Sequence, residues 1–380
     1  MFFRLNPECY YVKGEHSGAI YDLIEGSVYS LDTNENQVIL NCEKNGNVST
    51  TDPFLVEMKN KCLGNFYNEK VFIEKLRVGS PMLDLQQGKP VNLQNVFLEI
   101  NNTCNESCWY CGSKGVHRSS GCLGCNTWPD EIGTPLTPEE WKKVIDRLTD
   151  LKCQSLFLSG GDLTLAWELT KDLVDYAHLK FPQICVIVNS KQFTSIFAKD
   201  LKGKAFPMIQ TDDITNINAD ERYLLISGEN EVINHQSLSS KMVYIDRVFG
   251  EFSNLPEDSY LISKNKIQKT DIFRFAHTRK NHPCLGNTLT ISWKGDVLPC
   301  PLLRKYSLGS VKDRQLHEIF IKSADEIKKF WNMSLENIPK CKMCEFRYSC
   351  NDCRALEEAL TGDLYGKTLC RYDVAKGVWV

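Results

Sequence analysis

Seventeen cysteines are the feature of this 380-residue sequence that most clearly points to chemistry. Their odd number argues against a fully paired disulfide framework, and clustered thiols in a reducing compartment indicate a metal site. The tightest group is Cys104, Cys108 and Cys111, spaced CxxxCxxC directly after the apolar run 96–100, which predicts a strand. Three thiolates on one short loop can hold three irons of a 4Fe-4S cluster. The fourth iron then stays open for a substrate or cofactor.

Structural zinc is the alternative, because zinc also binds cysteines at short spacing. A zinc site would need a fourth ligand near the loop, and His117, Cys122 and Cys125 are candidates. Cys122 and Cys125 could equally be ordinary thiols in a tight loop, or supply a ligand that another cluster lacks. Five other cysteines lie among apolar residues and are expected in the core: Cys9, Cys42, Cys62, Cys153 and Cys185.

A second set of cysteines gathers near the C-terminal end. Two of them frame an expected hairpin over 288–300, and four follow as CxxC and CxxC separated by five residues. This set comprises Cys284, Cys300, Cys341, Cys344, Cys350, Cys353 and Cys370. A pattern of seven cysteines over this length is a more specific sign of a metal-cluster domain than an isolated CxxC.

The strand followed by CxxxCxxC, with Tyr110 before the last cysteine, resembles the signature of the radical SAM superfamily. The resemblance implies that the open iron binds the amino and carboxylate groups of S-adenosylmethionine. Electron transfer then releases a 5′-deoxyadenosyl radical, which abstracts a hydrogen atom. In such enzymes the cofactor carries the difficult chemistry and the protein orients it.

Three later segments resemble further parts of the same family pattern. LFLSGGDLT (156–164) is similar to its Gly-Gly-Glu segment, with a shorter Asp and with Leu163 in place of the usual Pro. The segments 186–190 and 224–236 are similar to those of the third and fourth strands. The resemblance implies cofactor contacts by Tyr110, Gly160, Gly161, Asp162, Asn189, Ser190 and Ser227.

The C-terminal cysteine pattern resembles the SPASM domain, which houses two auxiliary clusters. The resemblance implies one complete ligand set, formed by Cys341, Cys344, Cys350 and Cys370. The other set, formed by Cys284, Cys300 and Cys353, is one thiolate short. Only two residues separate Cys350 from Cys353, whereas the family usually has three residues before this last clustered cysteine.

The order of predicted elements divides the chain at 1–85, 92–275 and 276–380. The middle part alternates strands and helices, as in TPEEWKKVIDRLTDL, where Thr137 and Glu140 form a capping box. This alternation predicts a parallel sheet with crossover helices. With the resemblance, the expected fold is α/β: a partial (β/α)6 TIM-like barrel followed by an irregular iron–sulfur SPASM domain.

Residues 1–85 are expected to form a winged-helix-like α+β module. Two strands are predicted within 18–32, helices near 34–46 and 53–63, and a strand over 71–76, with a linker over 77–91. Such a module resembles the element of peptide maturases that binds a leader peptide, usually as an added strand. The runs Ile20–Leu23 and Val28–Leu31 are the expected edge.

Composition excludes several other classes of function. A net charge of −3 provides no field for a nucleic-acid backbone, and no apolar run is long enough to cross a bilayer. The start of the chain lacks the apolar stretch of a signal peptide, so a cytoplasmic location is expected. The expected function is maturation of a ribosomally made precursor peptide with a leader, using an electron donor such as flavodoxin or ferredoxin. An anaerobic sulfatase-type maturase and a non-enzymatic zinc protein are the alternatives.

Overall fold

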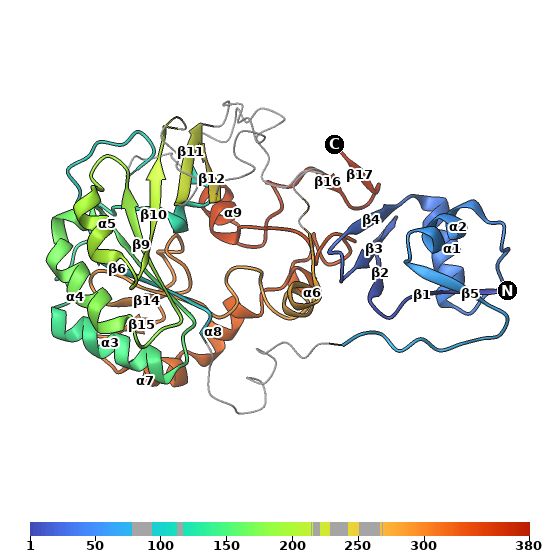
Figure 1. Ribbon diagram of the computed structural model, residues 1–380, viewed down its shortest axis with the longest axis horizontal. Helices are drawn as coiled ribbons and strands as arrows, with labels where there is room; N and C mark the ends of the chain where they lie inside the picture. The colour runs from blue at the N-terminus through green and yellow to red at the C-terminus, as the bar shows by residue number, and fades with distance from the viewer. Residues whose placement is uncertain are drawn as a thin grey trace.

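The computed structural model describes residues 1–77, 93–111, 117–213, 215, 221–228, 242–250, 267 and 269–380. The larger part of the molecule is built on a ten-stranded sheet in the order β15-β14-β13-β6-β8-β9-β10-β11-β12-β7 (Figure 1). Six successive strands are parallel, as expected for a partial (β/α)6 barrel, and within the described ranges the two outer strands do not pair to close it. These are β6 (Asn95–Asn101), β8 (Ser155–Gly160), β9 (Gln183–Asn189), β10 (Phe206–Thr211), β11 (Arg222–Gly228) and β12 (Met242–Phe249).

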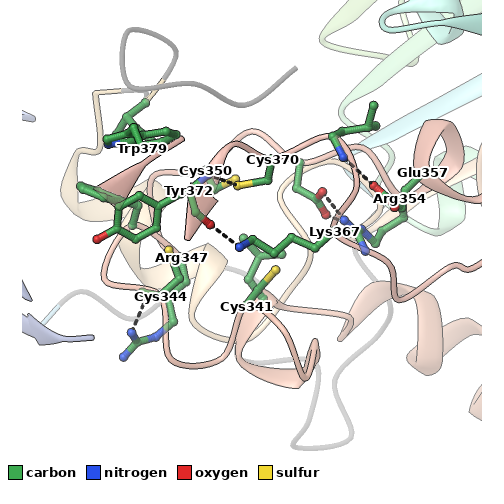
Figure 2. Close-up of a pocket in the computed structure, with 15 residues that line it drawn as sticks. Cys341, Cys344, Arg347, Cys350, Arg354, Glu357, Lys367, Cys370, Tyr372 and Trp379 are labelled. Atoms are coloured by element: carbon green, nitrogen blue, oxygen red, sulfur yellow. Dashed lines mark hydrogen bonds and ion pairs between the residues drawn. The ribbon is translucent and has the colours of Figure 1, made fainter. Parts of the chain in front are cut away.

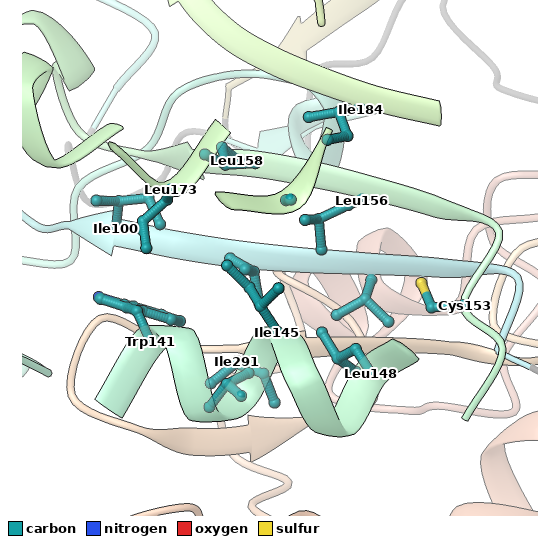
Figure 3. Packing of buried hydrophobic residues seen from close by; sticks show 14 of the residues in the cluster. Ile100, Trp141, Ile145, Leu148, Cys153, Leu156, Leu158, Leu173, Ile184 and Ile291 are labelled. Carbon is teal, nitrogen blue, oxygen red and sulfur yellow. The ribbon is translucent and has the colours of Figure 1, made fainter. Parts of the chain in front are cut away.

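Helices α3 (Pro138–Asp150), α4 (Trp167–Ala177) and α5 (Ser195–Leu201) connect the first four parallel strands. The expected capping box of α3 forms, since the Thr137 side chain accepts from Glu140 N and Glu140 reaches back to Thr137 N. The apolar stripe of α3 packs against β6 and β8 (Figure 3). Its buried residues are Trp141, Val144, Ile145 and Leu148.

The parallel strands present alternate side chains to two different clusters, as a pleated strand requires. In β9, Val186 and Val188 join the cluster with the helices, whereas Cys185 and Ile187 join an inner cluster. The inner cluster also contains Tyr110, from the first cysteine loop. The inner face of the sheet is therefore the face on which the cysteine loop lies.

One parallel strand was not predicted from the sequence. β10 contains Pro207, and a proline within an apolar run normally argues against a central strand. The structure tolerates Pro207 at the second residue of β10, opposite Val186 of β9. The segment beginning at Leu224 is consequently on the fifth parallel strand, and its prediction as the fourth was wrong.

The predicted hairpin near 288–300 is confirmed and extends the central sheet. β13 (Thr288–Ile291) pairs in parallel with β6 and antiparallel with β14 (Asp296–Leu298), and β15 (Gly309–Ser310) follows. Gly295 turns the hairpin at φ +97°, where a side chain would be strained. The sheet thus continues past the boundary expected at 275/276. The remaining C-terminal elements are α6 (Ile272–Thr278), α7 (Leu316–Lys322), α8 (Ala324–Trp331), α9 (Arg354–Thr361), β16 (Tyr372–Asp373) and β17 (Val378–Trp379).

The N-terminal part is an α+β module with a two-stranded and a three-stranded sheet, the latter in the order β2-β3-β4. Residues 71–77 form no strand, contrary to the prediction for 71–76, and the linker predicted over 77–91 lies almost wholly outside the described residues. The elements of the N-terminal module are β1 (Phe2–Leu5), β2 (Cys9–Lys13), β3 (Gly18–Asp22), β4 (Val28–Leu31), α1 (Thr33–Glu43), α2 (Pro53–Asn60) and β5 (Gly64–Tyr67). None of the helices in the described part of the chain has the length and apolar character of a membrane span.

This module packs directly on the C-terminal part of the chain. Tyr21 of β3 is fully buried against Phe275 and Tyr348, and its hydroxyl donates to Glu345 O (2.8 Å). The buried Glu345 carboxylate accepts from Ser17 and Tyr372. The module and the C-terminal cysteine region therefore share one apolar core.

Candidate active site

The first cysteine loop follows β6 at the carboxyl end of the parallel sheet. Cys104 is exposed, and Cys108 and Cys111 are half-buried. Desolvation raises the pKa of the Cys104 thiol, and the nearby Asp162, Cys111 and Cys108 raise it further. The structure thus brings the three cysteines together on one short loop.

The glycine pair after β8 packs against the backbone of this loop. A Cβ atom on Gly160, whose φ is +132°, would lie 2.4 Å from Asn101 O, and one on Gly161 would lie 2.1 Å from Thr103 O. Asp162 N donates to Thr103 O (2.7 Å), and Gly161 N donates to the Asn101 side chain (3.0 Å). Both glycines are needed sterically, because only they allow the end of β8 to approach the cysteine loop so closely.

Asp162 is buried beside that loop. Its Oδ1 atom accepts from Thr164 N (2.9 Å) and Thr164 Oγ1 (2.7 Å) and so caps the short helix η3 (Leu163–Ala166). Asn101 Nδ2 donates to Asp162 O (2.8 Å). The carboxylate is therefore held in a defined position near Cys104.

A buried polar network runs from the cysteine loop across the inner face of the sheet. Tyr110 Oη accepts from Asn189 Nδ2 (3.2 Å) on β9 and from Gln210 Nε2 (3.4 Å) on β10. Burial raises the pKa of Tyr110, so the phenol stays neutral. Gln210 Nε2 also donates to Cys125 Sγ (3.0 Å).

Arg118 of β7 (His117–Arg118) lies at the centre of this network. Its guanidinium pairs with Asp246 of β12 (Nη2 to Oδ2, 2.6 Å) and donates to Gln210 Oε1 (2.8 Å) and Cys125 O (3.1 Å). Sequence reasoning missed Arg118, Gln210 and Asp246. A prediction of β10 would have identified Gln210, because Gln210 lies near the carboxyl end of that strand, opposite Asn189 of β9.

The structure does not bring two of the expected cofactor contacts to this inner face. Ser190 is exposed, with its N–H donating to Gln210 O (2.9 Å). Alternation along β11 places Ser227 on the same face as Tyr223 and Leu225, which pack in the cluster with the helices. The Ser227 hydroxyl donates to Gly228 O (3.2 Å). Leu224 and Ile226 face the inner cluster instead.

One auxiliary set expected from the sequence lines a single pocket. Figure 2 shows Cys341, Cys344, Cys350 and Cys370 around this pocket, which Tyr372 and Trp379 also line. Arg354, which is 2% exposed, pairs with Asp352 at the same pocket and donates to Gly366 O (2.8 Å). Four thiols in an enclosed, largely apolar setting match the donor set of a 4Fe-4S cluster.

The other auxiliary set is connected to this pocket by Asp352. His282, fully buried, accepts from Cys284 N (3.2 Å) through Nδ1, and its Nε2 lies 3.4 Å from Asp352 Oδ2. Burial alone would raise the pKa of Asp352, but the Arg354 guanidinium holds it at about 2. Asp352 thus lies between the two sets of thiols, at the pocket of one set and beside the His282 that contacts Cys284 of the other.

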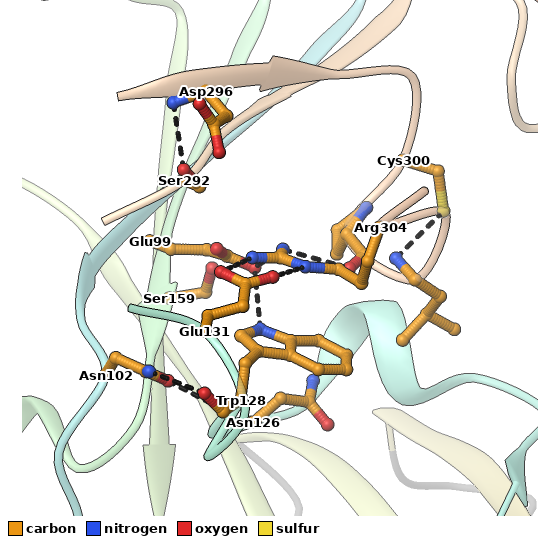
Figure 4. Close-up of polar contacts among 12 residues, drawn as sticks. Glu99, Asn102, Asn126, Trp128, Glu131, Ser159, Ser292, Asp296, Cys300 and Arg304 are labelled. Carbon is orange, nitrogen blue, oxygen red and sulfur yellow. Dashed lines mark hydrogen bonds and ion pairs between the residues drawn. The ribbon is translucent and has the colours of Figure 1, made fainter. Parts of the chain in front are cut away.

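A salt-bridge cluster joins this region to β6 (Figure 4). Arg304 donates to Glu99 Oε1 (2.7 Å) and forms two bonds with Glu131 (2.7 and 2.8 Å), and it lies 4.4 Å above the Trp128 ring. Burial raises the pKa of Glu99 despite the guanidinium. Trp128 N donates to Asn102 Oδ1 (2.6 Å), so the cluster also holds the segment that follows Cys125.

Clusters and single zinc ions require different arrangements of thiols. Every one of the seventeen cysteines is a free thiol. Within the described ranges, no three His, Cys, Asp or Glu side chains are arranged to hold one metal ion. Around a single tetrahedral zinc with bonds of about 2.3 Å the sulfurs converge on one point, whereas each thiolate of a cluster binds a different iron. Four of the five cysteines expected in the core are buried, and Cys62 is instead exposed.

Two family models match the chain. Residues 98–210 match the radical SAM superfamily, and residues 283–345 match SPASM, an iron–sulfur cluster-binding domain. The first match contains the cysteine loop, the glycine pair and Asn189, and the second contains four of the auxiliary cysteines. The chain therefore contains a radical SAM domain and a SPASM domain, which imply an enzyme with 4Fe-4S clusters and S-adenosylmethionine as cofactors.

Three crystal structures of Streptococcus suis SuiB are similar to this chain. SuiB bound to S-adenosylmethionine is 10% identical, with 93% of this chain and 96% of that chain covered and a TM-score of 0.42. SuiB bound to precursor peptide SuiA is 11% identical, with the same coverage and a TM-score of 0.46. A third SuiB structure is 10% identical, with 96% and 99% covered and a TM-score of 0.44. No curated protein matches the chain.

Proposed function

We propose that this enzyme modifies a ribosomally made precursor peptide, which it holds by a leader segment on its N-terminal module. When bound, the catalytic cluster supplies the electron that cleaves S-adenosylmethionine to a 5′-deoxyadenosyl radical. That radical is indiscriminate, so selectivity must come from how the protein positions its substrate. A tethered leader raises the effective concentration of the reacting segment at the active site.

A free strand edge in the N-terminal module carries this proposal. β3 is paired on both sides, so the expected edge at Ile20–Leu23 is wrong, whereas Val28–Leu31 is an edge strand, β4. Among the described residues β4 pairs only with β3, and it lies at the outside of the sheet in Figure 1. An unpaired edge can add an extended peptide through main-chain hydrogen bonds.

The register of the hairpin identifies which groups are free. Asp22 N donates to Ser27 O (2.9 Å), and opposed pairs alternate along an antiparallel ladder. Ile20 and Tyr29 therefore form a hydrogen-bonded pair, while the N–H groups of Val28 and Ser30 point away from β3. Ser30 is exposed, so its N–H can donate to a peptide that lies along β4.

Ser30→Pro should weaken leader binding about three- to tenfold, because one backbone hydrogen bond contributes about 0.5–1.5 kcal/mol. Proline removes only the outward N–H and is tolerated on edge strands. The measurement is fluorescence anisotropy with a labelled candidate precursor peptide that includes its leader. Ser30→Ala keeps the N–H and should bind as the parent does, and cleavage of S-adenosylmethionine without peptide should be unchanged in both variants.

Equal affinity of the Pro and Ala variants would overturn leader binding at β4 and would favour a sulfatase-type protein substrate. Deletion of the whole module is a poorer test. It would remove Tyr21 and expose Phe346 and Tyr372, which pack with Tyr21 in a shared core beside the auxiliary pocket.

We further propose that Asp162 helps to hold the amino group of S-adenosylmethionine. A buried charge-assisted hydrogen bond contributes about 1.5–3 kcal/mol, so Asp162→Ala should raise the dissociation constant about ten- to a hundredfold. Equilibrium dialysis of the reconstituted enzyme without reductant gives this constant. Asp162→Asn preserves an acceptor for Thr164 but removes the charge, and it should bind almost as weakly as the Ala variant. Full affinity of the Asn variant would show that Asp162 serves only as the cap of η3.

A further inference from the structure

The auxiliary site formed by Cys284, Cys300 and Cys353 has three thiols from the SPASM region, whereas a 4Fe-4S cluster has four irons to ligate. A cluster with three thiolates exposes an iron that can bind substrate directly. A cluster with four thiolates can only exchange electrons. The chemistry of this site therefore depends on whether the rest of the chain supplies one more ligand.

The segment after β7 is fixed next to this site. β7 pairs with β12 through Arg118 opposite Val248 and His117 opposite Phe249. Ser119 N donates to Arg247 O (2.9 Å), and Ser120 N donates to Asp246 Oδ1 (2.8 Å). These bonds hold the short helix η2 (Gly121–Leu123), and with it Cys122, at the end of the sheet.

The same end of the sheet contacts the SPASM region. α9 packs on β7, and Cys353 is the N-cap residue directly before α9. Phe249 of β12, fully buried, shares an apolar cluster with Cys353 and Leu356. Cys353 also packs with Cys300 in a second cluster. The helix that carries Cys353 therefore brings this group of thiols to the segment that carries Cys122.

The half-buried thiol of Cys122 is close enough to these thiols for their charges to interact. Desolvation raises its pKa, and Cys300 and Cys353 raise it further. The pKa of the Cys284 thiol is likewise raised, chiefly by desolvation and further by the neighbouring thiols Cys353, Cys300 and Cys122. Cys125 behaves differently, since the thiols that act on it belong to the first cysteine loop: Cys111, Cys104 and Cys108.

We propose that Cys122, a residue of the radical SAM region, supplies the fourth thiolate of the auxiliary cluster at Cys284, Cys300 and Cys353. This cluster is then closed to substrate and serves in electron transfer. The segment from Cys122 to Cys125 joins the two sites, since Cys125 accepts from Gln210 Nε2 (3.0 Å) in the network of the catalytic loop. The assignment does not depend on which substrate the enzyme modifies.

The test uses the Cys104/Cys108/Cys111→Ala background, in which only auxiliary clusters remain. Cys122→Ala in this background should lose about one iron per chain or change the EPR spectrum of one reduced cluster. Cys122→Ser, which keeps an oxygen ligand, should retain the iron but shift the spectrum. Cys153→Ala removes a buried core thiol far from both sites in sequence and should leave iron content and spectrum as in the background.

Imidazole tests whether the iron is open. Added imidazole should change the EPR spectrum of the Cys122→Ala protein, where an iron has lost its thiolate, but not that of the background protein. A response of the background protein itself would mean that the site is open with Cys122 present. Either that response, or a Cys122→Ala variant with unaltered iron content and spectrum, would overturn the proposal.

Discussion

Replacing Cys104, Cys108 and Cys111 together with alanine should abolish reductive cleavage of S-adenosylmethionine. These three residues are the only thiols on the loop that follows β6, so the catalytic cluster loses all its protein ligands. The auxiliary cysteines lie in a separate region and should keep their iron. The measurements are 5′-deoxyadenosine formation by liquid chromatography and iron content per chain.

A control for loss of thiols as such is the triple variant Cys9/Cys42/Cys153→Ala. These cysteines are buried in apolar clusters outside the candidate sites, and the variant should still form 5′-deoxyadenosine. If the Cys104/Cys108/Cys111→Ala enzyme also formed 5′-deoxyadenosine above the background without enzyme, the catalytic cluster would have to lie elsewhere.

Arg118→Met should lower the free energy of unfolding by about 3–5 kcal/mol, since removing one partner of a buried ion pair leaves the other charge uncompensated. Arg118 is 6% exposed and Asp246 is fully buried, and their side chains are 2.6 Å apart. Met is similar in length, so the change removes mainly the charge and its hydrogen bonds. Urea denaturation of the anaerobically reconstituted protein gives this free energy.

The exposed pair Arg147–Asp150 provides the matched control. Its side chains are 48% and 65% exposed, and exposed pairs contribute about 0–1 kcal/mol, so Arg147→Met should have little effect. The double variant Arg118→Met/Asp246→Leu should recover part of the loss, because it leaves no buried charge. If the double variant were less stable than Arg118→Met alone, the further cost would come from the bond that Ser120 N donates to Asp246 rather than from an uncompensated charge.

Several local features could be predicted because they depend on residues close together in sequence. The capping box at Thr137 and Glu140 and the hairpin over 288–300 need only side chains and backbone that are close in sequence. Alternation of strands and helices was enough to predict the parallel sheet, since a crossover helix after each buried strand allows few other arrangements.

Errors arose where a strand depended on its neighbours. Pro207 argues against a strand by local rules, yet β10 forms between β9 and β11, where burial of Met208 and Ile209 outweighs the missing donor. Likewise, β3 and β4 have similar local character, and only the pairing order shows that β3 is central and β4 is the edge. Tertiary context decides such cases, because pairing energy comes from cross-strand contacts rather than from the strand itself.

By itself, the sequence determined the kind of chemistry, because three thiols within eight residues must share a loop whatever the fold. It also determined the likeness of the C-terminal cysteines to a SPASM domain, since that pattern lies in their spacing. Only the tertiary structure decided which distant groups meet: Arg118 with Asp246, and helix α9 with strand β7. The physical reason is that the sheet order and the packing of α9 on β7 bring together residues more than a hundred positions apart, which no local spacing records.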